Sequence, residues 1–241
     1  MSELMFRVHK SLDERHSEIK KEFRSGGVKP AYAISCQDGI LMVTVNSNPR
    51  SYKIKKIFDR IVFAGVGNSD DHEKLYASAS AFAKIQGNMK RSPGDLRTVD
   101  DIMTILKGHV RELFRDLFRN NYMECEFIIA VVGFDKKEDR IYSVDFSGHH
   151  EFDSSWLTIP VEDSTIEEKK FLYRDDFTMK EALRELFAKG NLKIGKEILT
   201  IHNKLFIEVV ILSREEVVKK IFEKVYRRLN QEEIKEWLDG A

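Results

Sequence analysis

The stretch PRSYKIKKIFDRIVFAGVG, residues 49–67, decides the fold class. It holds two strand-sized segments, residues 52–55 and 61–66, joined by a short charged connection over residues 56–60. The second segment is apolar throughout, which is typical of a strand that is buried on both faces. Since such a strand needs a covering layer on each side, we expect this pair near the middle of a layered protein that contains both sheets and helices.

The residues before this stretch predict a hairpin and, further upstream, a helix. Two apolar runs, residues 31–35 and 40–45, flank Gln37-Asp38-Gly39, and the Asp-Gly pair is typical of a β-hairpin turn. An amphipathic helix is predicted over residues 9–24 because its apolar side chains recur at helical spacing. These side chains are Leu12, His16, Ile19 and Phe23.

The residues after this stretch predict elements in blocks. Two long helices, starting near Ser69 and Thr98, come first. A second strand cluster follows at residues 125–134, 140–146 and 150–153, and a short strand at 155–159 is expected to close the same cluster. The remaining expected elements are helices at 164–173 and 178–192, a strand at 204–212, and one C-terminal helix carrying Val218, Ile221, Phe222, Val225 and Leu229.

This order favours an α+β fold with antiparallel sheets over alternating βαβ units. We expect two sheets that face each other with helices on the outside, which makes a four-layer αββα sandwich. The sequence has neither a Pro/Gly/Ser linker nor a repeat, so we expect a single domain over residues 1–241.

Composition excludes several classes of function. Forty Lys and Arg balance forty Asp and Glu, which argues against a nucleic-acid or membrane-surface binder. Two cysteines exclude a disulfide scaffold and a four-cysteine zinc site, and they favour the reduced cytoplasm. We expect neither a membrane span nor a secretory signal, because no apolar run approaches 18 residues and the N-terminal residues lack an apolar core segment.

Familiar catalytic and cofactor motifs are incomplete or absent, so we expect no cofactor and no metal. Gly65-Val66-Gly67 precedes a helix but lacks the third glycine of a dinucleotide-binding loop. His149 and His150 are adjacent, and neighbouring strand residues point to opposite faces. Cys36 has no His nearby in sequence, and no G-x-S-x-G motif occurs.

The stretch at 49–67 and its surroundings resemble the proteasome subunit family, in particular the non-catalytic α-type subunits of the bacterial 20S proteasome. The resemblance extends over roughly residues 9–230 and includes both central helices, the strand and turn IYSVDFSG at 141–148, and the strand IEVVIL at 207–212. It implies the Ntn-hydrolase-like version of the αββα sandwich.

The resemblance also implies that the chain is not an enzyme. Catalytic subunits of the family expose an N-terminal Thr whose own α-amino group takes the proton from its hydroxyl. Here Gly26-Gly27 is followed by Val28, and the family's catalytic aspartate falls near Val45. Of three catalytic roles only the lysine is kept, as Lys53.

In α-type subunits the helix before the first strand packs across the top of the ring, and the residues ahead of it gate the entrance. The resemblance assigns the helix role to residues 9–24 and the gate to Met1, Ser2, Glu3, Leu4, Met5, Phe6, Arg7 and Val8. The Tyr-Ser-Pro-Asp-Gly-Arg signature of archaeal and eukaryotic α-type subunits is absent, which indicates the bacterial type. The alternative is a plain amphipathic helix on an unrelated αββα protein.

The same resemblance gives Lys53 a role in docking. In family rings the matching lysine lies in a pocket between neighbouring subunits and binds the C-terminal carboxylate of an activator. Gly67 matches the glycine beside that pocket, where a partner's backbone approaches closely. The alternative is that Lys53 is an edge-strand lysine that discourages aggregation.

The implied function is therefore a gating α-ring subunit. Seven copies would form a ring that stacks on a ring of β-type subunits and receives unfolded proteins from a ring-shaped AAA ATPase. Two other functions stay open at this point. One is a divergent self-compartmentalising Ntn hydrolase or transpeptidase with its own nucleophile, and the other is a stand-alone ring-forming relative.

Overall fold

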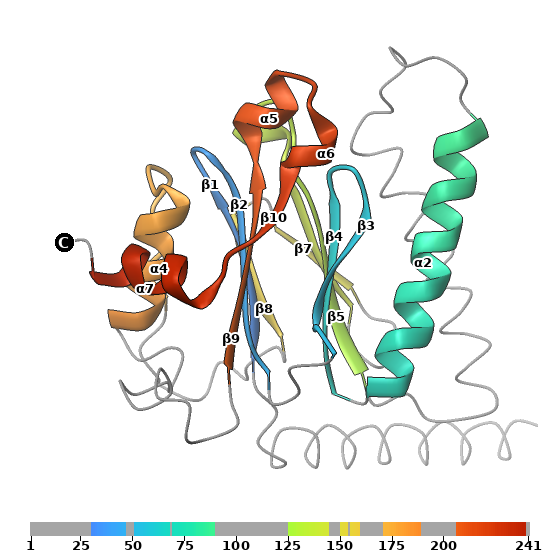
Figure 1. Cartoon of the computed structure of the whole chain (residues 1–241), viewed down its shortest axis with the longest axis horizontal. Helices are drawn as coiled ribbons and strands as arrows, with labels where there is room; N and C mark the ends of the chain where they lie inside the picture. The colour runs from blue at the N-terminus through green and yellow to red at the C-terminus, as the bar shows by residue number, and fades with distance from the viewer. Residues whose placement is uncertain are drawn as a thin grey trace, which may run out of the picture.

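The computed structural model describes residues 30–46, 51–67, 69–89, 125–144, 150–153, 155–159, 171–188 and 206–239. Within these residues lie two five-stranded sheets in which every strand pair is antiparallel (Figure 1). This confirms the expectation of a mixed α/β protein with two antiparallel sheets. The predicted helix at 9–24, the gate residues, the second central helix and the helix at 164–173 lie outside the described residues, wholly or almost wholly.

The first sheet has the order β10-β9-β2-β1-β8, and the second has the order β3-β4-β5-β6-β7. The strands of the first sheet are β1 (Ala31–Cys36), β2 (Gly39–Asn46), β8 (Trp156–Ile159), β9 (Phe206–Ser213) and β10 (Tyr226–Arg228). Those of the second are β3 (Ile54–Phe58), β4 (Ile61–Gly67), β5 (Cys125–Val131), β6 (Arg140–Val144) and β7 (His150–Asp153). The helices are α2 (Ser69–Met89), the 3₁₀ turn η1 (Lys136–Glu138), α4 (Met179–Ala188), α5 (Arg214–Val218), α6 (Phe222–Val225) and α7 (Gln231–Asp239).

Strand β4 shows why the stretch at 49–67 decides the arrangement. Val62, Ala64 and Val66 belong to the apolar cluster between the two sheets, where side chains of β1, β2 and β9 meet them. Ile61 and Phe63 point the other way, into a cluster that α2 completes with Leu75 and Ala79. The predicted burial on both faces is therefore confirmed, since every β4 residue except Gly67 is buried.

The other outer face is covered by helices from the C-terminal part of the chain. Tyr32, Leu41 and Val209 of the first sheet pack against side chains of α4 and α7, among them Leu183, Leu186 and Ile234. Figure 1 shows α2 beside the second sheet and α4 and α7 on the opposite side of the molecule. Among the helices in the described ranges, none is long and apolar enough to cross a membrane.

The predicted hairpin is confirmed, because Cys36 pairs with Gly39 across the Gln37-Asp38 turn. The placement of the strand at 155–159 is wrong. This segment, β8, pairs with β1 in the first sheet instead of closing the second. Leu157 and Ile159 pack in the apolar cluster between the sheets, and Trp156 packs against the cluster on the outer face of the first sheet. A place beside β1 therefore gives the apolar side chains of β8 partners on both faces of the sheet.

The prediction of a single C-terminal helix is also wrong. The segment divides into α5, α6, β10 and α7. Lys220 has a left-handed backbone with φ of 59°, which ends α5 after five residues. Tyr226–Arg228 then returns to the edge of the first sheet, where Leu229 N donates to Val209 O at 3.0 Å. The apolar spacing predicted one helix face, but Val218 is 58% exposed.

Candidate functional site

Lys53 lies directly before β3, at the end of the molecule where β2 stops. Its ammonium donates to the carbonyl oxygen of Val45, with Nζ 3.0 Å from O. Gly67 ends β4, and because Ile54 pairs with Ala64 in the antiparallel β3–β4 ladder, the start of β3 and the end of β4 lie at this same end. The structure thus brings Lys53 and Val45 into contact and places Gly67 at the same end, which we call the Lys53 end.

Gly67 is exposed and has a backbone φ of 109°, a conformation that residues with a side chain rarely adopt. The strand end therefore requires glycine for its backbone geometry, whatever approaches it from outside. The proposed gate residues lie outside the described part of the chain.

The backbone of Lys53 is held from both sides. Its N–H donates to Oε1 of Glu208 at 3.0 Å, and the next N–H, of Ile54, donates to Oε2 at 3.2 Å. Its carbonyl accepts from Gly65 N at 3.3 Å. Nε2 of His72 lies 3.0 Å from the same carbonyl, and since a carbonyl only accepts, Nε2 carries the proton.

Glu208 is the centre of a buried network that joins the two sheets. It stands in β9 and is 2% exposed. The guanidinium of Arg228, from β10, donates to Glu208 Oε2 at 2.7 Å and to the carbonyl of Ile54 in the second sheet at 2.5 Å. The side-chain amide of Asn46 donates to Oε1. A buried carboxylate needs this many partners, because an unpaired charge inside a protein is costly.

An exposed aromatic side chain adjoins this network. Tyr52 is 45% exposed, and the Arg228 guanidinium lies 3.7 Å from the centroid of its ring. A cation over an aromatic face is a favourable contact, so Arg228 connects the buried carboxylate of Glu208 to the surface beside Lys53.

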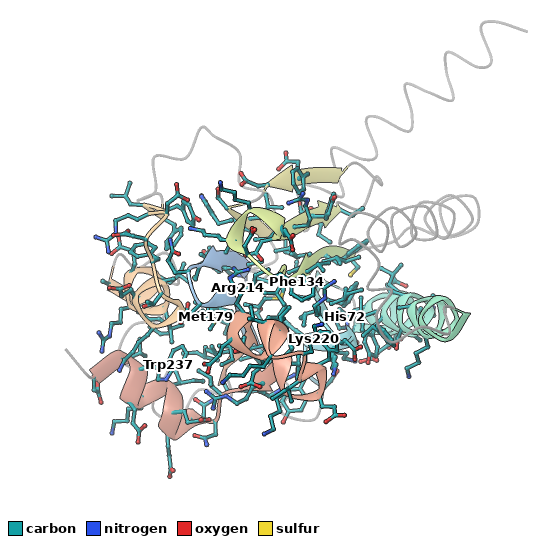
Figure 2. The ribbon with its side chains drawn as sticks, turned by 90° about the horizontal axis from the view of Figure 1, so that it is seen from above. His72, Phe134, Met179, Arg214, Lys220 and Trp237 are labelled. Carbon is teal, nitrogen blue, oxygen red and sulfur yellow. The ribbon has the colours of Figure 1, made fainter. Side chains whose placement is uncertain are left out.

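His72 occupies a tight place at the start of α2, on the side of the molecule that α2 covers (Figure 2). It is 5% exposed, and its ring lies 5.0 Å from that of Phe63. A Cβ on Gly65 would come within 2.0 Å of His72 Cδ2, so only glycine at 65 leaves room for the imidazole. Burial lowers the pKa of His72 to about 4, against the opposing effect of the bond to the Lys53 carbonyl.

The depressed pKa of His72 predicts an acid-sensitive fold. A histidine in the unfolded chain has a pKa near 6.5. The stabilisation of the folded chain by neutral His72 is therefore complete above pH 6.5 and is lost as the pH falls towards about 4. Between pH 7.5 and 5 this amounts to about 2 kcal/mol of unfolding free energy. His72→Gln keeps an N–H donor and does not titrate, so its melting temperature should fall less over that range. Parallel pH curves for the two proteins would contradict the assignment.

The opposite end of the sheets holds a second buried carboxylate. Asp139, before β6, accepts two parallel hydrogen bonds from Arg214, at 2.9 Å and 2.8 Å, and one from Ser35 Oγ at 2.5 Å. Arg214 also donates to the carbonyls of Cys36 and Gly133. Arg214 begins α5, and Figure 2 labels it in the view from above. Arg214 follows Glu208 by six positions, with residues 209–213 of β9 between them, which is about 20 Å along a strand.

Neither cysteine is placed as a nucleophile. Cys36 and Cys125 are fully buried and unbridged. Burial raises the pKa of both thiols well above the usual range, so they stay protonated at neutral pH. Within the described ranges no group of three His, Cys, Asp or Glu side chains could hold a metal ion.

Lys53, Val45 and Gly67 could be singled out from the sequence, whereas the parts played by Glu208, Arg228 and His72 could not. One signal was present: Glu208 interrupts an otherwise apolar strand, FIEVVILS, and a charge in a buried strand needs a partner.

Comparison with known proteins confirms the predicted resemblance. No family model matches the chain. A proteasome subunit alpha of Renibacterium salmoninarum is 23% identical over 231 residues, which cover 93% of this chain and 92% of that subunit. One from an Arthrobacter species is 27% identical, with 92% and 93% covered. One from Pseudarthrobacter chlorophenolicus is 30% identical over 139 residues, which span 56% of this chain and 57% of that subunit.

Proposed function

We propose that this chain, a relative of bacterial proteasome α subunits along most of its length, is the non-catalytic α-ring subunit of a bacterial 20S proteasome. The observation that carries the proposal is the pair formed by Lys53 and Val45. The family lysine is present, but the family aspartate falls near Val45, an apolar residue whose backbone carbonyl accepts a hydrogen bond from the lysine ammonium. A valine offers no carboxylate to a proton-transfer step, which supports a structural rather than a catalytic role.

The proposal includes the complete architecture. The chain folds as one domain over residues 1–241, a four-layer αββα sandwich of the Ntn-hydrolase type. The packing of α2 on the second sheet, and of α4 and α7 on the first, supports this arrangement. To residues 9–24 we assign the role of the helix that lies across the ring.

The partners follow from the same role. Seven copies form a ring that stacks on a ring of β-type subunits, which supply the catalytic Thr. A ring-shaped AAA ATPase docks on the outer face through terminal carboxylates and passes unfolded proteins inward. We place the docking pocket at Lys53 and Gly67, and the particle in the cytoplasm, in keeping with the two unbridged cysteines.

The first test concerns catalysis. We expect the purified chain alone to cleave no peptide substrate and to keep its N-terminus at or near Met1, because no Thr, Ser or Cys directly follows Gly26 or Gly27. Intact mass spectrometry and a fluorogenic peptide assay measure both. Loss of about 27–30 residues together with peptide hydrolysis would favour a self-processing hydrolase instead.

The second test concerns the gate, which we assign to residues 1–8. A short segment that switches between order and disorder can control access to a pore. Deleting residues 2–8 should raise the rate at which the complete particle hydrolyses small peptides and leave its assembled mass otherwise unchanged. As a control, substitution of Lys235, an exposed residue of α7, should not alter the rate of peptide hydrolysis. Equal rates for truncated and intact particles would place the gate elsewhere.

A further inference from the structure

We propose that Glu208 and His72 are positioning residues for Lys53, and that they fix its ammonium at the Lys53 end so that it can bind a partner's carboxylate. This rests on the docking role proposed above for Lys53. Neither residue touches the partner in this account. Each acts through the backbone of Lys53 or through the acceptor of its ammonium.

The backbone of Lys53 is fixed by two buried side chains. Glu208 accepts a hydrogen bond from the Lys53 N–H, and His72 donates one to the Lys53 carbonyl. The two side chains come from β9, a strand of the first sheet, and from α2, a helix that packs on the second sheet. With both polar groups of one residue bound to buried side chains, the peptide planes on either side of Lys53 have fixed orientations, and so does its Cα–Cβ bond.

Glu208 also holds the strand that carries the acceptor of the Lys53 ammonium. Lys53 Nζ donates a hydrogen bond to the carbonyl of Val45. Asn46, the residue after Val45, donates hydrogen bonds from its side-chain amide to Glu208 and, at 2.6 Å, to the carbonyl of Ser51. The same carboxylate therefore holds the strand that carries the acceptor and the segment that carries the donor. Glu208 sets both ends of the contact between Lys53 and Val45.

A fixed ammonium favours the binding of a carboxylate ligand. A lysine side chain has four rotatable bonds, and ordering it on binding costs conformational entropy. An ammonium already held at one place loses less of this freedom when a carboxylate arrives, so affinity rises through preorganisation. The charge of the Glu208 carboxylate is itself paired with the Arg228 guanidinium, 2.7 Å away.

The test uses Glu208→Gln, with Asp139→Asn as the matched control. Oε1 of Glu208 accepts from Asn46 and Lys53, and Oε2 accepts from Ile54 and Arg228, so an amide can serve only one of these pairs. Asp139 is likewise a buried carboxylate paired with an arginine, but at the opposite end of the sheets. Both variants should therefore lose thermal stability, and only one of them should affect Lys53.

Two measurements on the assembled ring report the result. Hydrogen exchange of a peptide covering residues 51–58 measures the order of the Lys53 segment without any activator. Fluorescence anisotropy measures binding of a synthetic peptide that copies the C-terminus of the ring ATPase from the same organism. The same peptide with an amide in place of its terminal carboxylate measures the background binding. Glu208→Gln should speed exchange in residues 51–58 and weaken peptide binding at least tenfold, whereas Asp139→Asn should do neither.

A second pair of variants serves if Glu208→Gln fails to fold. His72→Leu removes the donor to the Lys53 carbonyl, and His72→Gln restores one. We expect weaker peptide binding for the leucine variant and near-normal binding for the glutamine variant. Equal binding by both would overturn the part assigned to His72.

The outcomes separate this inference from the docking proposal. If Lys53→Ala binds the peptide as well as the unmodified protein does, the docking role itself is wrong. If Lys53→Ala loses binding while Glu208→Gln keeps it, the docking role stands and the positioning role is wrong. Equal weakening by Glu208→Gln and Asp139→Asn would also overturn positioning, since it would reflect a general loss of stability.

Discussion

Lys53→Ala is expected to abolish docking of the ATPase ring while ring assembly and hydrolysis of small peptides by the β ring continue. Removing the ammonium leaves the incoming carboxylate desolvated and without a partner. A charge-assisted hydrogen bond contributes about 1.5–3 kcal/mol, and several subunits engaged by one activator multiply the effect. A pull-down of the assembled particle with the ATPase measures the loss.

Two substitutions serve as controls for this result. Lys53→Arg should restore docking only in part, because a planar guanidinium does not occupy the place of a compact ammonium. Lys55→Ala should leave docking intact, since the Lys55 ammonium pairs with Glu73 on α2. Lys53 also adjoins β3, which with β7 forms the two edges of this sheet among the described residues. Undiminished docking by Lys53→Ala, with increased aggregation, would assign it the edge-strand role.

Arg214→Ala is expected to destabilise the folded chain by about 3–5 kcal/mol, the usual cost of leaving a buried charge without its partner. The Asp139 side chain is fully buried, and Arg214 provides two of its hydrogen bonds. The same guanidinium donates to carbonyls of the β1–β2 turn and of Gly133, so its loss also leaves buried acceptors unpaired. Chemical denaturation of the purified chain measures the difference.

Lys219→Ala is the control, because Lys219 lies at the C-terminal end of the same helix, α5, that Arg214 begins. Lys219 pairs with Glu215 four residues earlier, and both side chains are more than half exposed. Exposed pairs of this kind contribute little. We expect no measurable change in stability. If Arg214→Ala also left the stability unchanged, the buried network of Asp139 and Arg214 would not contribute to the stability of the fold.

The fold was predictable where short-range patterns determine it. The apolar run in β4 and the Asp-Gly turn between β1 and β2 each depend on a few adjacent residues, and both predictions are confirmed. The C-terminal helix was wrong for the opposite reason. The residues of β10 leave the helical path to pair with β9, and Arg228 reaches a carboxylate in that strand. Apolar spacing alone carries no information about such a partner.

The candidate site divides in the same way. Lys53 could be identified because its neighbours form a recognisable sequence around it. Glu208 could not be linked to it from the sequence, since 155 positions separate the two residues and only the packing of the two sheets joins them. His72 is an isolated histidine in the sequence, and its role depends on the absence of a side chain at Gly65, a packing detail visible only in three dimensions.

The most direct test of the central claim is the native mass of this chain co-expressed with the β-type subunit from the same genome. A non-catalytic α-ring subunit buries its ring surfaces only against neighbouring copies and the β ring. Native mass spectrometry should therefore show seven copies per ring, stacked on β rings, in a particle whose peptide hydrolysis disappears when the β-type Thr is replaced by Ala. A monodisperse monomer at micromolar concentration, with no β-type subunit bound, would contradict the account.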